Sequence, residues 1–205
     1  MSDQAAAGAV ATTRAEQAAI TRAKLVNATI EALIEHGYAA ASTTVICARA
    51  GVSRGAQIHH FPTKLALIGD AIDELARRMG RRLRREARRA DRSDRVAAAI
   101  DLLWSGFSSP EAEAFLELWS AARHDQDLAT LLRPTRIRME QAAIDEIQSA
   151  LGFADDGRDS EAVFRATLTM MQGLLARRLP QDEAGNNHHG VVLEDWKRLA
   201  RLLLA

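Results

Sequence analysis

The sequence predicts an all-α fold from three observations. Alanine and leucine dominate the 205 residues, of which 47% are hydrophobic and only 4% aromatic, a composition that favours helices. Apolar residues recur at intervals of three and four along most of the chain, which is the period of a helix with one buried face. Runs that alternate β-branched and polar residues are absent from the sequence, so we expect no sheet.

Residues 1–15 lack the basic start and long apolar stretch of a signal peptide. They are expected to form a disordered arm instead. The first helix is expected over about 16–36, where apolar residues have helical spacing, and Gly37 ends it. No apolar run reaches membrane-spanning length, so no membrane partner is expected. The single Cys47 excludes an intrachain disulfide and fits a reducing cytoplasm.

Two short helices joined by a tight turn are predicted next. Ser42 or Thr43 can cap the first helix through its hydroxyl oxygen, and Gly51 can end it in the left-handed conformation. Ser53 can cap the second helix, over 54–60. This is the outline of a helix-turn-helix, a motif that places its second helix in the DNA major groove.

The rest of the chain is predicted to be a bundle of helices. They are expected over about 63–90, 93–107, 110–123, 134–151, 160–179 and 191–204, with a short separate segment from Asp125 or Asp127 to Leu132. Ser93 and Ser109 can cap the helices that follow them. Pro134 is expected to begin a helix, because proline at a first helical position loses no hydrogen bond.

The helix over 54–60 carries side chains suited to DNA. Arg54 can bond guanine O6 and N7 together, and Gln57 has an amide suited to adenine. Lys64 lies near a helix N-terminus, where phosphate is favoured. The predicted DNA contacts are Thr43, Thr44, Ser53, Arg54, Gly55, Ala56, Gln57, Ile58, His59, His60 and Lys64. The alternative is that these are ordinary polar residues on a short surface helix.

The same segment resembles the DNA-binding domain of TetR-type transcriptional regulators, whose usual form is close to T-x-x-x-I-A-x-x-A-G-V-S-x-G-x-x-Y-x-H-F-x-x-K. The matching residues here are Thr43, Ile46, Ala50, Gly51, Val52, Ser53, Gly55, His60, Phe61 and Lys64. Residues 30–38 look like the end of that family's first helix and its Gly-aromatic turn. The resemblance is specific over about fifty residues, and beyond them only length and helical content agree.

Two residues depart from the family pattern. Ile58 stands where many members have a tyrosine that contacts the DNA backbone, which removes one hydroxyl contact. Cys47 stands where a small alanine is usual. Free cysteine packs as a small hydrophobe; a redox-sensing thiol is the alternative, although the chain has no second cysteine to resolve it.

The resemblance implies a sequence-specific, DNA-binding transcriptional regulator rather than an enzyme. It implies an arm over 1–15, a helix-turn-helix domain over 16–64, and an effector-binding and dimerisation domain over 65–205. The expected partners are an inverted-repeat operator, a second copy of the chain paired through its last two helices, and an unidentified small-molecule effector. Repression is the usual mode in this family, and activation stays open.

A helical small-molecule-binding protein or enzyme without a DNA-binding role is the alternative. The sequence contains no G-x-S-x-G, H-E-x-x-H or phosphate-binding glycine loop, so no cofactor is expected. His188 and His189, taken with His36 and His124, match no zinc spacing, so no metal is expected.

An apolar effector pocket is expected among the helices of the second domain. Its predicted lining is Trp104, Phe107, Trp119, Met139, Phe164 and Met171, with Arg123 and His124 as polar contacts. For each of these residues plain core packing is the alternative.

The formal net charge is zero, with 27 basic and 27 acidic residues, but its distribution is uneven. Residues 14–64 carry six basic and three acidic side chains, which makes phosphate binding plausible. Eight arginines lie between Arg77 and Arg89. They could form a solvated surface, attract DNA at long range, or hold an acidic group in the body of the protein.

Overall fold

The computed structural model of the protein describes residues 13–153, 157–176 and 188–204. Every regular element in these residues is an α-helix, which confirms the predicted class. The helices are α1 (Arg14–Ala40), α2 (Thr43–Ala50), α3 (Arg54–His60), α4 (Lys64–Ala87), α5 (Arg95–Phe107), α6 (Pro110–Ala122), α7 (Gln126–Leu151), α8 (Gly157–Ala176) and α9 (His188–Leu203). None of these helices is long and apolar enough to cross a membrane.

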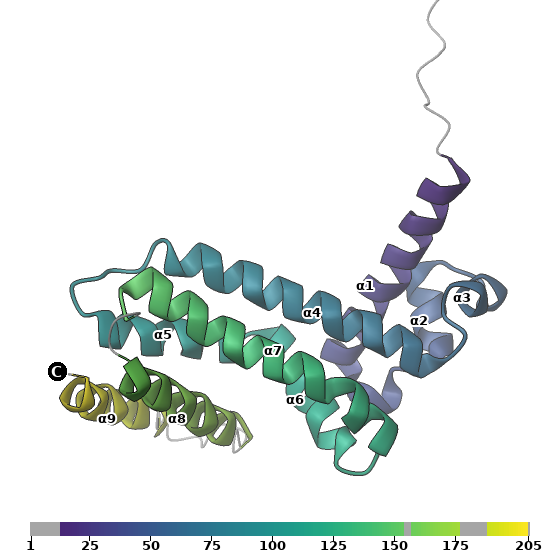
Figure 1. Ribbon diagram of the computed structural model, residues 1–205. Helices are drawn as coiled ribbons and strands as arrows, with labels where there is room; N and C mark the ends of the chain where they lie inside the picture. Colours follow the sequence, from purple (N-terminus) through teal and green to yellow (C-terminus); the bar gives the residue numbers. More distant parts are fainter. Residues whose placement is uncertain (1–12, 154–156, 177–187, 205) are drawn as a thin grey trace, which may run out of the picture.

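The long helices α4 and α7 lie alongside each other and form the spine of the molecule (Figure 1). Helices α1, α2 and α3 gather where α4 begins, and α1 also packs against α6. Helices α5, α8 and α9 pack together at the opposite end of the spine. The helix-turn-helix and the last two helices are therefore at opposite ends of one elongated chain.

Helix α1 begins earlier than the sequence predicted. The Thr13 hydroxyl accepts a hydrogen bond from Glu16 N at 3.2 Å, and the Glu16 carboxylate accepts one from Thr13 N at 2.6 Å. This reciprocal capping box starts the helix at Arg14, so the end of the predicted arm is helical. Residues 1–12 lie outside the described residues. Gly37 has φ +71° and breaks the helix, as predicted, although helical structure resumes briefly after it.

Two predicted helix starts were wrong. Pro134 lies inside the continuous helix α7 and does not begin a new one. Its missing N–H costs one backbone hydrogen bond, but Leu128 and Leu132 before it are buried in the core beside α4, and Ile144 and Ile147 after it are buried in a second core. Asp94, not Ser93, caps α5, because its carboxylate accepts from Ala97 N at 3.0 Å.

Two hydrophobic cores hold the described residues together. The first combines the helices around the helix-turn-helix with side chains of α6 and α7, including Phe61, Phe115, Leu118 and Leu128. The second joins α5, α7, α8 and α9, with Phe153 and Phe164 at its centre. The predicted boundary between residues 64 and 65 therefore does not separate two cores.

Candidate nucleic-acid interface and effector pocket

The helix-turn-helix is closed by the caps that its sequence predicted. The Ser42 hydroxyl accepts from Val45 N at 3.3 Å, and the Ser53 hydroxyl accepts from Ala56 N at 3.2 Å. Gly51 ends α2 with φ +63°, a conformation that favours glycine. Val52 N donates to Cys47 O at 3.1 Å across the turn. These bonds fix the direction in which α3 leaves α2.

Most of the predicted DNA contacts form one exposed surface on α3 and the start of α2. The side chains of Thr44, Ser53, Arg54, Ile58 and His59 are exposed. Gly55 is exposed beside them, and Thr43, Ala56 and His60 are half-buried. Arg54 has no hydrogen-bond or ion-pair partner among the described residues. An unpaired guanidinium in the first turn of a recognition helix is suited to a base edge, and these contacts stay predictions.

Gln57 does not belong to that surface, which corrects the predicted adenine contact. Its side chain is only 1% exposed, and its Nε2 donates to the carbonyl of Phe61 at 2.6 Å. Its Oε1 is buried without a partner. The amide therefore closes the C-terminal end of α3 from inside the protein.

Lys64, a predicted phosphate contact, also has partners within the protein. Its ammonium donates to the carbonyl of Tyr38 at 3.1 Å and lies 4.3 Å from the centre of the Tyr38 ring. Burial lowers the pKa of Lys64. The Tyr38 hydroxyl in turn donates to Asp125 at 3.2 Å. Lys64 therefore fastens the start of α4 to the end of α1, which is bonded to the start of α7.

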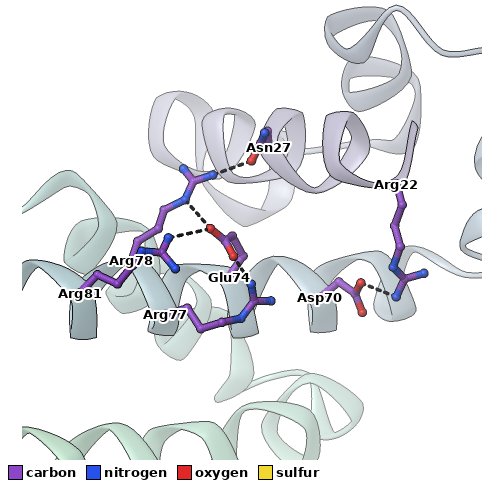
Figure 2. Close-up of polar contacts among 7 residues, drawn as sticks. All are labelled: Arg22, Asn27, Asp70, Glu74, Arg77, Arg78 and Arg81. Atoms are coloured by element: carbon purple, nitrogen blue, oxygen red, sulfur yellow. Dashed lines mark hydrogen bonds and ion pairs between the residues drawn. The ribbon is translucent and has the colours of Figure 1, made fainter. Parts of the chain in front are cut away.

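Ion pairs tie α1 to α2 and α4. Arg49 of α2 binds Glu35 of α1 through both carboxylate oxygens, and this hydrogen bonding lowers the pKa of Glu35. Arg22 of α1 pairs with Asp70 of α4 (Figure 2). Cys47, two residues before Arg49, is buried in α2.

Three of the clustered arginines gather around one acid, Glu74 (Figure 2). Arg77 contacts one carboxylate oxygen, and Arg78 and Arg81 donate to the other at 3.1 Å. Burial raises the pKa of Glu74, but hydrogen bonds from Arg78 and Arg81 outweigh it, so the pKa is lowered overall. Arg78 also donates to Asn27 of α1 at 2.5 Å. These arginines hold an acidic group, one of the three roles open from sequence, and link α4 to α1.

A cavity of about 560 Å³ lies between α4, α5, α6, α7 and α8. Its volume falls within the range of small-molecule sites. Of the eight predicted lining residues, Phe107, Trp119 and Met139 are in its wall.

The other five predicted pocket residues lie elsewhere. Trp104 stacks on His189 with ring centroids 5.8 Å apart. Phe164 packs edge-on against Phe153 at 5.1 Å and, like Met171, belongs to the second core. Arg123 and His124 are exposed after the end of α6. Helical spacing showed which faces are buried, but not which core each face joins.

The cavity has a charged wall that the sequence analysis missed. Arg77 and Arg84 line it from α4, and Arg136, Arg138 and Glu146 line it from α7. The seven-residue spacing of the two α4 arginines, with Gly80 between them, places all three on one helix face. That spacing was the available signal, and the density of arginines concealed it.

Comparisons with known proteins agree with this architecture. The family model for bacterial regulatory proteins of the tetR family matches residues 25–71. The HTH-type transcriptional regulator CymR of Pseudomonas putida is 32% identical over 175 residues, which is 83% of this chain and 85% of CymR.

Two solved structures share the fold. The multidrug binding protein EbrR, complexed with imidazole, has a TM-score of 0.65 at 19% identity, over 90% of this chain and 94% of that chain. GusR of Salmonella enterica has a TM-score of 0.64 at 20% identity, over 90% of this chain and 95% of that chain. From the helix-turn-helix and the CymR match, the chain belongs to the TetR family of DNA-binding transcriptional regulators, which are not enzymes.

Proposed function

We propose that the protein is a homodimeric repressor that leaves an inverted-repeat operator when a small molecule fills the cavity. The observation that carries this proposal is that α4 and α6 line the cavity and also pack in the core around the helix-turn-helix. A ligand that moves either helix therefore acts on the packing of α1. Acting on operator DNA, such a repressor works in the cytoplasm.

The dimer is proposed to form through α8 and α9. Small residues occupy the exposed face of α8 at helical spacing: Ala162, Ala166, Thr169 and Gly173. Large apolar residues are exposed on α9: Val191, Leu199, Leu202 and Leu203. Helices with small side chains at a contact approach closely, and an exposed apolar stripe indicates an interaction site. A second copy of the chain would bury both surfaces, the small-residue face of α8 and the apolar stripe of α9.

A two-fold dimer would present two copies of α3 to successive major grooves. Those grooves are about 34–36 Å apart along one face of the DNA. A ligand that binds better to a dimer with another spacing lowers operator affinity, and by linkage the operator lowers ligand affinity equally.

Two contacts offer a route from the cavity to α1, which packs against α2 of the helix-turn-helix. Arg77 lines the cavity and shares Glu74 with Arg78, which bonds Asn27 of α1. On the other side, α6 packs against α1 directly. The small ligands in solved structures of EbrR, imidazole and ethidium, support the idea of a ligand here.

The proposal is tested first on DNA from upstream of the gene. We expect a mobility shift with dimeric stoichiometry on an inverted repeat, and no shift when the half-site spacing is changed by five base pairs, about half a turn. Binding of a monomer to a single half-site with equal affinity would contradict the dimeric model.

We expect Arg54→Ala to weaken specific operator binding by about 1–3 kcal/mol and to relax the preference at one base position. Gln57→Met is the matched control on the same helix, and it should leave base preference unchanged because Gln57 is buried. Binding to operators substituted at each position measures both effects. A change of base preference caused by Gln57→Met, but not by Arg54→Ala, would reverse these roles.

A further inference from the structure

The charged residues in the cavity wall leave one positive charge uncompensated. Four arginines and three acids line the cavity. Arg138 pairs with Asp73 at 3.3 Å, and Arg136 pairs with Glu140 at 2.7 Å. Arg77, whose partner Glu74 is outside the lining, remains with Arg84 and Glu146, so the lining residues carry a net charge of one positive unit.

Arg84 lines this space with an exposed side chain whose guanidinium has no partner among the described residues. A Cβ added at Gly80 would lie 3.5 Å from Nη1 of Arg84, so the guanidinium folds back over the glycine. It has no hydrogen bond or ion pair among the residues that the structure describes. Glu146 lies in the same wall and forms no ion pair with it there. Unused N–H donors therefore face the cavity beside Gly80.

Arg77 lies two turns earlier on the same face of α4, and its guanidinium points toward Glu74 (Figure 2). It contacts Glu74, which it shares with Arg78 and Arg81. One carboxylate cannot use the donors of three guanidiniums, each of which carries five N–H groups. Only Arg84 therefore places free donors over Gly80, in the planar fork that suits a carboxylate, while Arg77 adds positive charge to the same wall.

The remainder of the cavity is suited to an apolar body. Leu103, Phe107, Phe115 and Trp119 line it from α5 and α6, opposite the arginines of α4. A small carboxylate without an apolar part would make no contact with these apolar residues of α5 and α6. A molecule without charge would forgo the charge-assisted hydrogen bonds that the Arg84 donors offer.

We propose that the effector is an amphipathic organic monoanion, with its carboxylate on Arg84 over Gly80 and its apolar part against α5 and α6. This inference rests on the proposed function, because it names the ligand class of the same cavity. A single negative charge neutralises the wall. A second one would meet Glu146, which disfavours dicarboxylates by like-charge repulsion.

The test uses probes matched in shape and different in charge. Octanoate, decanoate and phenylbutyrate are titrated into the full-length protein by calorimetry, beside their primary amides and the corresponding ammonium ions. We expect at least one carboxylate to bind about tenfold or more tightly than its amide, as for a hydrogen bond to a charged group. The ammonium ion should bind more weakly still.

Variants of α4 locate the charge. Arg84→Gln should remove the preference for carboxylate over amide, and Arg84→Lys should restore part of it, because the charge is kept while the planar fork is lost. Arg85→Gln is the control, since Arg85 is exposed like Arg84 but does not line the cavity. It should bind like the wild-type protein, and circular dichroism verifies that each variant is folded.

The proposal is overturned if an ammonium probe binds as well as its carboxylate, if none of the probes binds, or if Arg85→Gln has the effect expected of Arg84→Gln. These measurements contain no DNA. Failure of the proposed repressor function would instead show as absent operator binding, or as operator binding unchanged by a carboxylate that calorimetry detects.

Discussion

Replacing Leu199 and Leu202 together by glutamate is expected to make the protein monomeric and to weaken operator binding by about 10²- to 10⁴-fold. Both leucines are on α9, with 49% and 75% of their surface exposed. In a two-fold interface each appears twice. Fully burying an exposed leucine contributes about 1.5–3 kcal/mol, and these leucines are already partly buried, so the four together account for roughly 4–7 kcal/mol of association. Four buried carboxylates of like charge would add repulsion to this loss.

Size-exclusion chromatography with light scattering at micromolar concentration measures the first effect, and a mobility shift measures the second. Ile137→Glu is the matched control, because Ile137 is 53% exposed on α7, outside the proposed interface. We expect it to remain dimeric and to bind the operator normally. A monomeric Ile137→Glu protein together with a dimeric leucine variant would move the interface to α7.

Local chemistry explains what could be predicted from the sequence. The caps of the helix-turn-helix and the glycine that ends α2 depend on residues close together in the chain. The Ser53 hydroxyl accepts a hydrogen bond from a backbone N–H three residues later. Gly51 adopts the left-handed conformation, which favours glycine over other residues. Such local signals do not depend on tertiary contacts, so the motif and the all-α class could be predicted directly from the sequence.

The errors arose where contacts between distant parts of the chain determine the direction of a side chain or the boundary of a helix. Gln57 is placed for base contact by its position on α3, but the Phe61 carbonyl needs a partner and turns the amide inward. Pro134 is itself a local signal for the start of a helix, but packing of α7 along α4 keeps the helix continuous. In both cases a tertiary contact outweighs a local preference.

The cavity was the least predictable feature, because a void is made by the divergence of several helices. Phe107 and Phe164 have the same apolar character and helical spacing, yet one lines the cavity and the other is 1% exposed in the second core. The arginines of α4 presented the opposite difficulty. Arg84 and Arg85 are indistinguishable in an arginine-rich run until the helix faces are placed against α5 and α7.

The shared core also predicts how the protein unfolds. Leu118 of α6 has no exposed surface and packs in the core that contains Leu25 of α1 and Phe61. Leu118→Ala should lower the free energy of unfolding by about 2–5 kcal/mol. Because the helix-turn-helix has no separate core, we expect one cooperative transition in which operator binding and body structure are lost together.

Urea denaturation followed by circular dichroism measures this loss, and tryptophan fluorescence reports the body, where Trp104, Trp119 and Trp196 lie on α5, α6 and α9. Leu116→Ala is the control on the same helix. Leu116 is half-buried and already faces the cavity, so truncation removes fewer contacts and should cost less than half as much.

If Leu118→Ala shifted the fluorescence transition but left operator binding at its wild-type denaturant midpoint, the two ends of the protein would be energetically independent. A ligand between α4 and α6 could then not reach the recognition helix through the core, and release from DNA would have to depend on the arginine cluster around Glu74 alone.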